Sequence, residues 1–148
     1  TLEVNDSVMP ASNSIMARNF FTLGAFYADS GAIERSREML GAVQDSMQRY
    51  AGQYSNWMHL ALWLDTPFYE VVITGPKAGD KLASLQAQYL PHVLLAASEE
   101  HVSAPLFENR HSPDTTRIFV CQFGQCLQPL ETVPEALKEI ELKANNLG

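Results

Sequence analysis

Two cysteines carry the most specific chemistry in this chain. Cys121 and Cys126 are its only cysteines, and the first of them ends the apolar run of residues 117–121. Two thiols so close in sequence can form a disulfide or exchange electrons with another thiol pair. Their C-x4-C spacing is not the C-x-x-C spacing that lowers a thiol pKa at a helix N-terminus. Cys121 and Cys126 are therefore redox candidates, but we favour two buried structural thiols, because cysteine is among the most commonly buried residue types.

A glycine-containing turn offers a second candidate. Gly75, Lys77 and Gly79 lie between a β-branched run and a helical pattern, and backbone N–H groups at such a turn can hold a phosphate. The turn matches neither a dinucleotide-binding glycine motif nor a P-loop, and Pro76 lacks one backbone donor. We favour a plain tight turn over a phosphate site.

The histidines do not form a recognisable metal motif. Structural zinc needs about four ligands, commonly with paired histidines three to five residues apart. No such pair occurs among the histidines, which are His59, His92, His101 and His111. The last two share one polar segment, but their spacing alone predicts nothing. We expect no metal and no cofactor.

Acid–base and sugar-binding residues are present only as types. Glycoside chemistry needs two facing carboxylates, and the neighbouring Glu99 and Glu100 do not form a facing pair, nor does Glu108 supply one by spacing. Aromatic side chains can stack on sugars, but aromatic residues at helical spacing are more often core; those concerned here are Trp57, Trp63, Tyr27 and Tyr50. We predict no catalytic residues.

Composition excludes several classes of partner. The net charge of -7, with ten scattered Lys and Arg residues, argues against nucleic acid, because phosphate binding needs a positive field. No apolar stretch approaches the roughly 18–20 residues that cross a bilayer, and we expect no signal peptide. Two cysteines are too few for a disulfide-stapled secreted scaffold, so a reducing, cytoplasmic compartment is the default expectation.

Residues 1–67 are predicted to be helical. One helix should run from an N-cap at Ser12 to Asp29, with an inward face of Met16, Phe20, Leu23 and Tyr27. A second should span residues 32–51 and end at Gly52. A third, from about 56 to 65, should follow a cap at Ser55 and stop before Pro67. Since the third is apolar almost all round, we expect it to be covered by a partner chain or by further sequence.

Residues 68–148 are predicted to form a small α/β module. Strands are expected at 69–74, 93–97 and 117–121, with a helix at 80–90 and a long loop at 98–116. The middle run is uninterrupted and apolar, as in a strand buried on both faces. Thr132 and Glu135 form a capping box before a last helix. The fold class is thus mixed helix and α/β, with three parallel strands in the order 2-1-3.

Four stretches together resemble the YyaL-like family of thioredoxin-domain proteins, also called spermatogenesis-associated protein 20-like. They are residues 3–23, which include P-A-S-N-S at 10–14, then 69–75, then Tyr-Leu-Pro at 89–91, and finally Phe-Val-Cys at 119–121 with Cys126 and Pro129 behind it. Two departures stand out. Residues 122–125 lack the Asn-containing spacer of the family, and Ala11 stands where the family has Gly. These put a family role of the inter-cysteine turn in question more than the fold.

The resemblance implies a position for this chain in a larger protein. Residues 1–67 would be the last helices of a six-hairpin α/α toroid, and residues 68–148 a C-terminal module, with a thioredoxin-like domain upstream. The partners would then be the rest of the parent chain, and the isolated segment would self-associate through the apolar faces of residues 57–64.

Three functional hypotheses follow. We favour a non-catalytic structural or interaction portion. An alternative is part of a carbohydrate-acting enzyme whose active centre lies upstream, which rests on analogy of fold. A further alternative is that Cys121 and Cys126 exchange electrons with the upstream thioredoxin-like domain.

Overall fold

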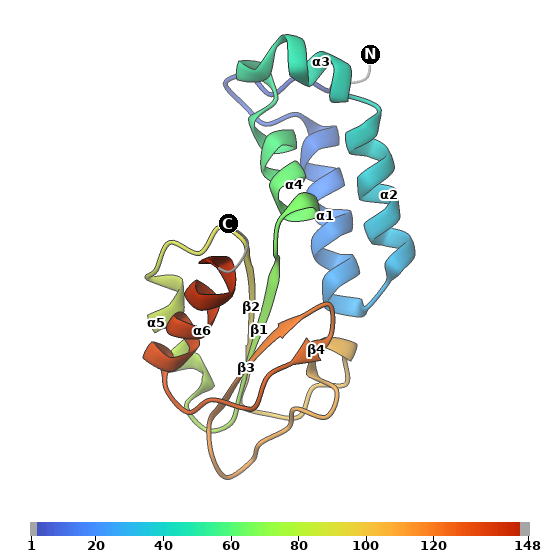
Figure 1. Cartoon of the computed structure of the whole chain (residues 1–148). Helices are drawn as coiled ribbons and strands as arrows, with labels where there is room; N and C mark the ends of the chain where they lie inside the picture. Colours follow the sequence, from blue (N-terminus) through green and yellow to red (C-terminus); the bar gives the residue numbers. More distant parts are fainter. Residues whose placement is uncertain (1–2, 146–148) are drawn as a thin grey trace. The chain divides into compact units, whose positions relative to one another are not determined.

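The computed structural model describes residues 3–145, with side chains described as far as residue 142. The chain forms two compact units, Thr1–Thr66 and Pro67–Gly148. The first is helical and the second holds a four-stranded sheet (Figure 1). The mixed fold class with a helical N-terminal part is confirmed. No helix within residues 3–145 is long and apolar enough to cross a membrane.

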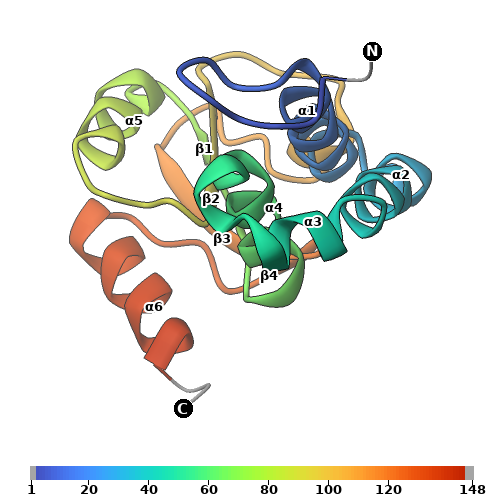
Figure 2. The ribbon, with the colours of Figure 1, turned by 90° about the horizontal axis from the view of Figure 1, so that it is seen from above.

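The helical unit contains four α-helices. They are α1 Ser12–Tyr27, α2 Ser30–Gly41, α3 Gln44–Arg49 and α4 Ser55–Asp65, with the short 3-10 helix η1 Ala51–Gln53 before α4. Within this unit α1 packs against both α2 and α4 (Figure 2). Asp29 caps α2, because its carboxylate accepts the amides of Gly31 and Ala32.

The predicted inward face of α1 is wrong. The buried residues are Ser14, Ala17, Phe21 and Gly24, whereas Met16, Leu23 and Tyr27 are each about half exposed, at 50%, 52% and 55%. A Cβ on Gly24 would lie 2.6 Å from Ile33 Cγ1. Gly24 therefore lets α2 approach α1 closely, and a hydrophobicity pattern cannot identify a helix face whose contact depends on a glycine.

The single helix predicted over 32–51 is interrupted. α2 ends at Gly41. After it, the Val43 amide donates to the Leu40 carbonyl three residues back, which is a hydrogen bond of the 3-10 type. Val43 is buried there, and α3 begins after it. Gly52 lies inside η1 instead of ending a long helix. The apolar spacing continues through the break, so the pattern alone could not locate it.

One carboxylate replaces the two serine caps that we predicted. Ser12 and Ser55 are the first residues of their helices and make no capping bond. Instead the buried Asp6 accepts the Ala11 amide at 3.0 Å and the Ser14 hydroxyl at 2.6 Å, and its other oxygen accepts the Asn56 amide at 2.8 Å. Asp6 thus joins the N-terminal ends of α1 and α4, where a negative charge is favoured.

The second unit is a mixed sheet. Its elements are β1 Tyr69–Thr74, α5 Ala78–Gln86, β2 Val93–Ser98, the 3-10 helix η2 Pro105–Phe107, β3 Arg117–Gln122, β4 Gln125–Cys126 and α6 Val133–Asn145. The strand order is β2-β1-β3-β4. β1 has the predicted bounds and the predicted central place, and β2 is parallel to it as expected.

The prediction that all strands are parallel is wrong for β3, which is antiparallel to β1. Thr74 pairs with Ser98 on one side and with Arg117 on the other, so the 98–116 loop begins and ends at the same end of the strands. For β3 to be parallel, the chain would have to cross back to the opposite end of the strands, which is usually done by a helix. The loop contains only the single turn η2, which does not provide one.

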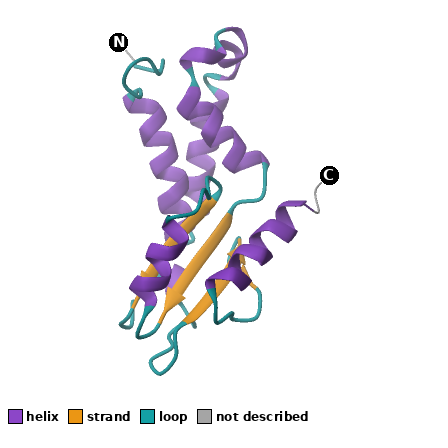
Figure 3. Cartoon of the chain, turned by 90° about the vertical axis from the view of Figure 1, so that its left-hand side faces the viewer, coloured by secondary structure: helices purple, strands orange, loops and turns teal. Residues whose placement is uncertain are grey.

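Helices α5 and α6 cover one face of the sheet (Figure 3). The core on that side includes Tyr69, Val71 and Ile73 of β1, with Leu85 and Ile140 from the helices. On the other face, the Thr74 hydroxyl donates to the Arg110 carbonyl at 2.5 Å, and Leu106 and Phe107 of the loop are buried. The long loop is therefore a packed layer that covers part of the second face.

Two details of this unit differ from expectation. β2 is half-buried at every position, and not buried on both faces, because it is an edge strand among those described. The helix expected at 80–90 is α5 at Ala78–Gln86, and Tyr89, predicted to face inward, is 90% exposed. Pro91 stops the helical pattern in sequence, but α5 already ends at Gln86, and Leu90 packs against the core whereas Tyr89 does not.

The capping box before α6 is confirmed. The Thr132 amide donates to Glu135 Oε2 at 2.9 Å, and the Glu135 amide donates to the Thr132 hydroxyl at 3.4 Å. The bonds from Thr132 lower the pKa of Glu135. Ile140 is buried and Leu137 half-buried, as predicted for the inner face, while Ala144 lies outside the described side chains.

Loss of this cap should be measurable. Thr132→Ala is expected to lower the free energy of unfolding by about 1 kcal/mol, as followed by circular dichroism in a denaturant series. Thr132→Ser keeps the hydroxyl and should change it little. Equal stability of the alanine variant and the native chain would show that the box contributes nothing.

Candidate functional site

The two cysteines lie opposite each other in a hairpin. β3 and β4 pair through Cys121 with Cys126 and Gln122 with Gln125, and Phe123 and Gly124 form the two-residue turn, with φ of 48° and 77°. Positive φ at both positions is the requirement of a type I′ hairpin turn. The paired sulfurs are joined in a disulfide. The prediction of two buried structural thiols is therefore wrong, because the two sulfurs are bonded to each other.

The two sulfurs have unequal surroundings. Cys121 is fully buried, whereas Cys126 is exposed at the edge of the sheet. Cys126 is therefore the cysteine nearer to an external thiol, whereas Cys121 is enclosed. This asymmetry arises from topology, because β3 lies inside the sheet and β4 is the last strand in its order.

An arginine from the long loop contacts the exposed sulfur. Arg110 Nε and Nη2 lie 3.2 and 2.9 Å from Cys126 Sγ, and Nη1 donates to the Leu106 carbonyl. Burial lowers the Arg110 pKa and the carboxylates of Glu70 and Glu108 oppose that change, so the guanidinium stays charged near neutral pH. A fixed positive charge beside a sulfur stabilises the thiolate form.

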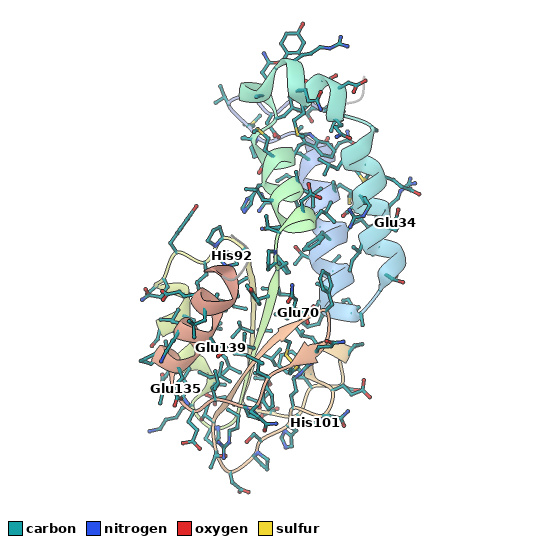
Figure 4. The ribbon with its side chains drawn as sticks, viewed as in Figure 1. Glu34, Glu70, His92, His101, Glu135 and Glu139 are labelled. Carbon is teal, nitrogen blue, oxygen red and sulfur yellow. A yellow bond between two sulfur atoms is a disulfide. The ribbon has the colours of Figure 1, made fainter. Side chains whose placement is uncertain are left out.

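A buried acid lies beside the other sulfur. Glu70 pairs in register with Cys121 across β1 and β3, so the two side chains are nearest cross-strand neighbours on one face. Glu70 Oε2 also accepts the Gly124 amide at 3.2 Å. Burial raises the pKa of Glu70, and the Gly124 bond and the Arg110 charge only partly oppose it. Figure 4 labels Glu70 and draws the disulfide in yellow.

A surface hollow of about 460 Å³ adjoins the exposed cysteine. It is lined by Gln122, Phe123, Gln125, Cys126 and Leu127. The Phe123 ring at the tip of the turn is 67% exposed. A partner in this hollow would meet two neutral polar side chains, the Phe123 ring and Leu127, with the Arg110 guanidinium at the Cys126 sulfur itself.

Of the predicted phosphate candidates, Gly75 and Lys77 lie in the β1–α5 turn and Gly79 lies in the first turn of α5. The Gly75 amide donates to the Ser98 carbonyl, and the Lys77 amide donates to the Thr116 hydroxyl at 3.0 Å. Gly75 has φ of 114°, and a Cβ there would lie 2.6 Å from the Thr115 carbonyl oxygen. The geometry accounts for Gly75 as a close backbone approach; phosphate binding by Gly75, Lys77 and Gly79 stays a prediction.

Among the histidines, the fold brings two together. His101 and His111 have ring centroids 5.4 Å apart, and both line a hollow of about 520 Å³ in the 98–116 loop together with Glu108. Glu99 and Glu100 are exposed and do not line that hollow. Within the described part of the chain, no group of three or more His, Cys, Asp or Glu side chains could hold a metal ion.

Two residues of the disulfide site escaped the sequence-based prediction. Glu70 had a signal, since it is the one charged residue in the strand Tyr69–Thr74, and a charge in a buried strand needs a reason. Arg110 had none, because it lies in an aperiodic segment 16 residues from its partner Cys126. No protein-family model, curated protein or solved structure was found to match this chain.

Proposed function

We propose that the β3–β4 hairpin is a thiol–disulfide exchange site, in which Cys126 reacts with an external partner and Cys121 closes or opens the internal disulfide. The observation that carries the proposal is the Arg110 guanidinium within 3.2 Å of the sulfur of the exposed cysteine, Cys126. A positive charge favours a thiolate at Cys126 both as an attacking group and as a leaving group.

The reduced site would act in two steps. The Cys126 thiolate attacks one sulfur of a partner disulfide, forms a mixed disulfide and releases the first partner thiolate. Glu70 then accepts the Cys121 proton, and the Cys121 thiolate attacks Cys126 Sγ and releases the second partner thiolate. Two electrons pass to the partner, whose two thiolates take up protons, and the internal disulfide forms. A partner dithiol drives the same steps in reverse.

The raised pKa of Glu70 suits this role. A carboxyl group whose pKa is shifted toward that of a thiol can accept the Cys121 proton and can return it when Cys121 is the leaving group. Glu70 is held by the Gly124 amide within the turn that joins the cysteines. The Glu70 carboxylate is thus held in place by the hairpin that carries both cysteines.

A purely structural role of the disulfide explains less. The bond closes a loop with a sequence separation of only 5, for which the chain-entropy model gives about 2 kcal/mol, near the low end for disulfides. A structural clip needs neither a guanidinium on one sulfur nor a buried acid beside the other. These two groups favour exchange chemistry over a clip.

The resemblance adds two hypotheses that concern the parent protein. A thioredoxin-like domain would be one source of the partner dithiol, and the helical unit would be the end of an α/α toroid. Met58 and Leu62 on α4, 45% and 58% exposed, support further sequence or a second copy packing there. The carbohydrate-acting hypothesis rests on the resemblance alone.

The Arg110 charge provides the test. After reduction, Arg110→Met should raise the pKa of the Cys126 thiol toward its ordinary value near 8.5 and lower the thiolate fraction at pH 7 several-fold, measured by thiolate absorbance in the Cys121→Ser background. The rate with glutathione disulfide should fall about threefold, since lower thiolate content is partly offset by greater nucleophilicity. Arg110→Lys keeps a charge and should fall between the two. An unchanged thiol pKa in Arg110→Met would refute the assigned role.

A further inference from the structure

We infer that the partner of this site is an extended polypeptide, which pairs as an added strand with the outer edge of β4 and places its own cysteine beside Cys126. The inference rests on the proposed exchange function and adds to it the class of substrate. Three features of the hairpin carry it: a free backbone edge at Cys126, the direction from which the sulfur can be attacked, and the exposed ring of Phe123.

The backbone at Cys126 faces outward. In an antiparallel pair, residues alternate between those that bond to the neighbouring strand and those that point away from it. Leu127 bonds inward, since its amide donates to the Val120 carbonyl at 3.1 Å. Cys126, the residue before it, therefore directs its amide and carbonyl away from β3. β4 ends the order of the described strands, so these groups are available to a further strand about 4.8 Å away.

We expect an in-line attack on Cys126 to come from that same edge. A thiolate approaches a disulfide sulfur in line with the bond that breaks. Because Cys121 and Cys126 are cross-strand partners, the bond runs roughly across the sheet from β3 to β4. The in-line approach to Cys126 comes from beyond β4, whereas the approach to Cys121 comes from the buried side where Glu70 lies. A cysteine in an added strand would be well placed to attack Cys126.

Phe123 provides side-chain recognition beside the edge. Its ring lines the same hollow as Cys126, Gln125 and Leu127, and no structural need for it is evident at a tip where its side chain is 67% exposed. Its φ of 48° favours glycine or asparagine, so the aromatic residue occupies a position where it is conformationally disfavoured. An apolar side chain next to the partner cysteine would cover the ring.

Peptide exchange kinetics test the inference. The full chain with Cys121→Ser would be mixed with a heptapeptide that has β-branched residues around one cysteine held as a mixed disulfide with glutathione. Adduct formation would be followed by acid quenching and mass spectrometry, with glutathione disulfide as the small-molecule control. We expect the peptide to react about tenfold faster. Phe123→Asn, which suits the turn, should remove most of that preference, and Tyr89→Ser, which removes another exposed ring elsewhere, should not.

Backbone methylation gives the sharpest signature. Two peptides would each carry one N-methyl group, at one or the other of two consecutive residues before the cysteine. Because only alternate peptide amides can bond to β4, one N-methyl group should slow the reaction about tenfold and the other should leave the rate within twofold. Equal effects at both positions, or a peptide rate equal to that of glutathione disulfide, would overturn the inference and leave the exchange function standing. If Cys126 reacts with both disulfides no faster than an unfolded cysteine peptide, the proposed function itself fails.

Discussion

The thiol of Cys126 in a Cys121→Ser variant should react with glutathione disulfide on the order of 100-fold faster than the thiol of Cys121 in a Cys126→Ser variant. Cys126 is exposed and receives two guanidinium N–H groups from Arg110. Cys121 is fully buried and reacts only after local opening. An opening that costs about 3 kcal/mol leaves roughly one molecule in a hundred reactive, and burial also raises a thiol pKa.

The measurement is a pair of second-order rate constants at pH 7, obtained with the two single-cysteine variants in parallel. The control is the same pair of rates in a concentrated denaturant. Unfolding exposes Cys121 and separates Cys126 from Arg110, so the two rates should become similar. Rates within threefold of each other in the native state would mean that the hairpin does not distinguish its sulfurs. The division of labour between an entering Cys126 and a resolving Cys121 would then be wrong.

Replacement of Asp6 should cost more stability than the loss of an ordinary helix cap in the helical unit. Asp6→Ala removes the acceptor of the Ala11 amide, the Ser14 hydroxyl and the Asn56 amide. The first two donors are then left in a buried site and the third in a part-buried one. Since one helix cap contributes about 1 kcal/mol and up to about 2, the joint loss at two helix starts should be about 3 kcal/mol. Asp29→Ala removes the cap of α2 only and should cost about 1 kcal/mol.

Tryptophan fluorescence in a denaturant series measures this effect locally. The only tryptophans are Trp57 and Trp63, and both lie in α4, whose first turn Asp6 holds. The signal therefore reports the helical unit and not the sheet. If Asp6→Ala costs no more than Asp29→Ala, Asp6 does not join two helix starts.

The same variant should reveal a pH dependence. Burial by itself would raise the pKa of Asp6, but the hydrogen bonds from Ser14, Ala11 and Asn56 outweigh it and lower the pKa. A folded-state pKa below the unfolded value of about 3.9 gives stability that is present above that pH and is lost as pH falls through the folded-state pKa. The stability gap between the native chain and Asp6→Ala should be constant from pH 5 to 7 and narrow below about pH 4.

Elements with strong local signals could be predicted from the sequence. The run Tyr69–Thr74 is β-branched between Pro67 and Gly75, and it forms β1 with the predicted bounds. The capping box of Thr132 and Glu135 begins α6, and the parallel pairing of β1 with β2 follows from the intervening helix α5. In each case neighbouring residues along the chain supply the physical cause. A turn between the cysteines was also evident.

Tertiary structure decided what depends on residues far apart in sequence. The buried face of α1 is set by how closely α2 can approach at Gly24, and the caps of α1 and α4 come from Asp6, which lies 50 residues from Asn56. The direction of β3 follows from a loop that starts and ends at the same end of the strands. None of these follows from local propensity or periodicity.

The candidate site divides in the same way. The sequence by itself determined that two cysteines flank a short turn after a strand, which is enough to name them as a redox pair. Only the tertiary structure buried one cysteine and left the other exposed. Only it brought Arg110 from a loop and Glu70 from β1 to the pair. The reason is physical: a thiol's reactivity is set by the charges and solvent around it, and those neighbours are supplied by the fold.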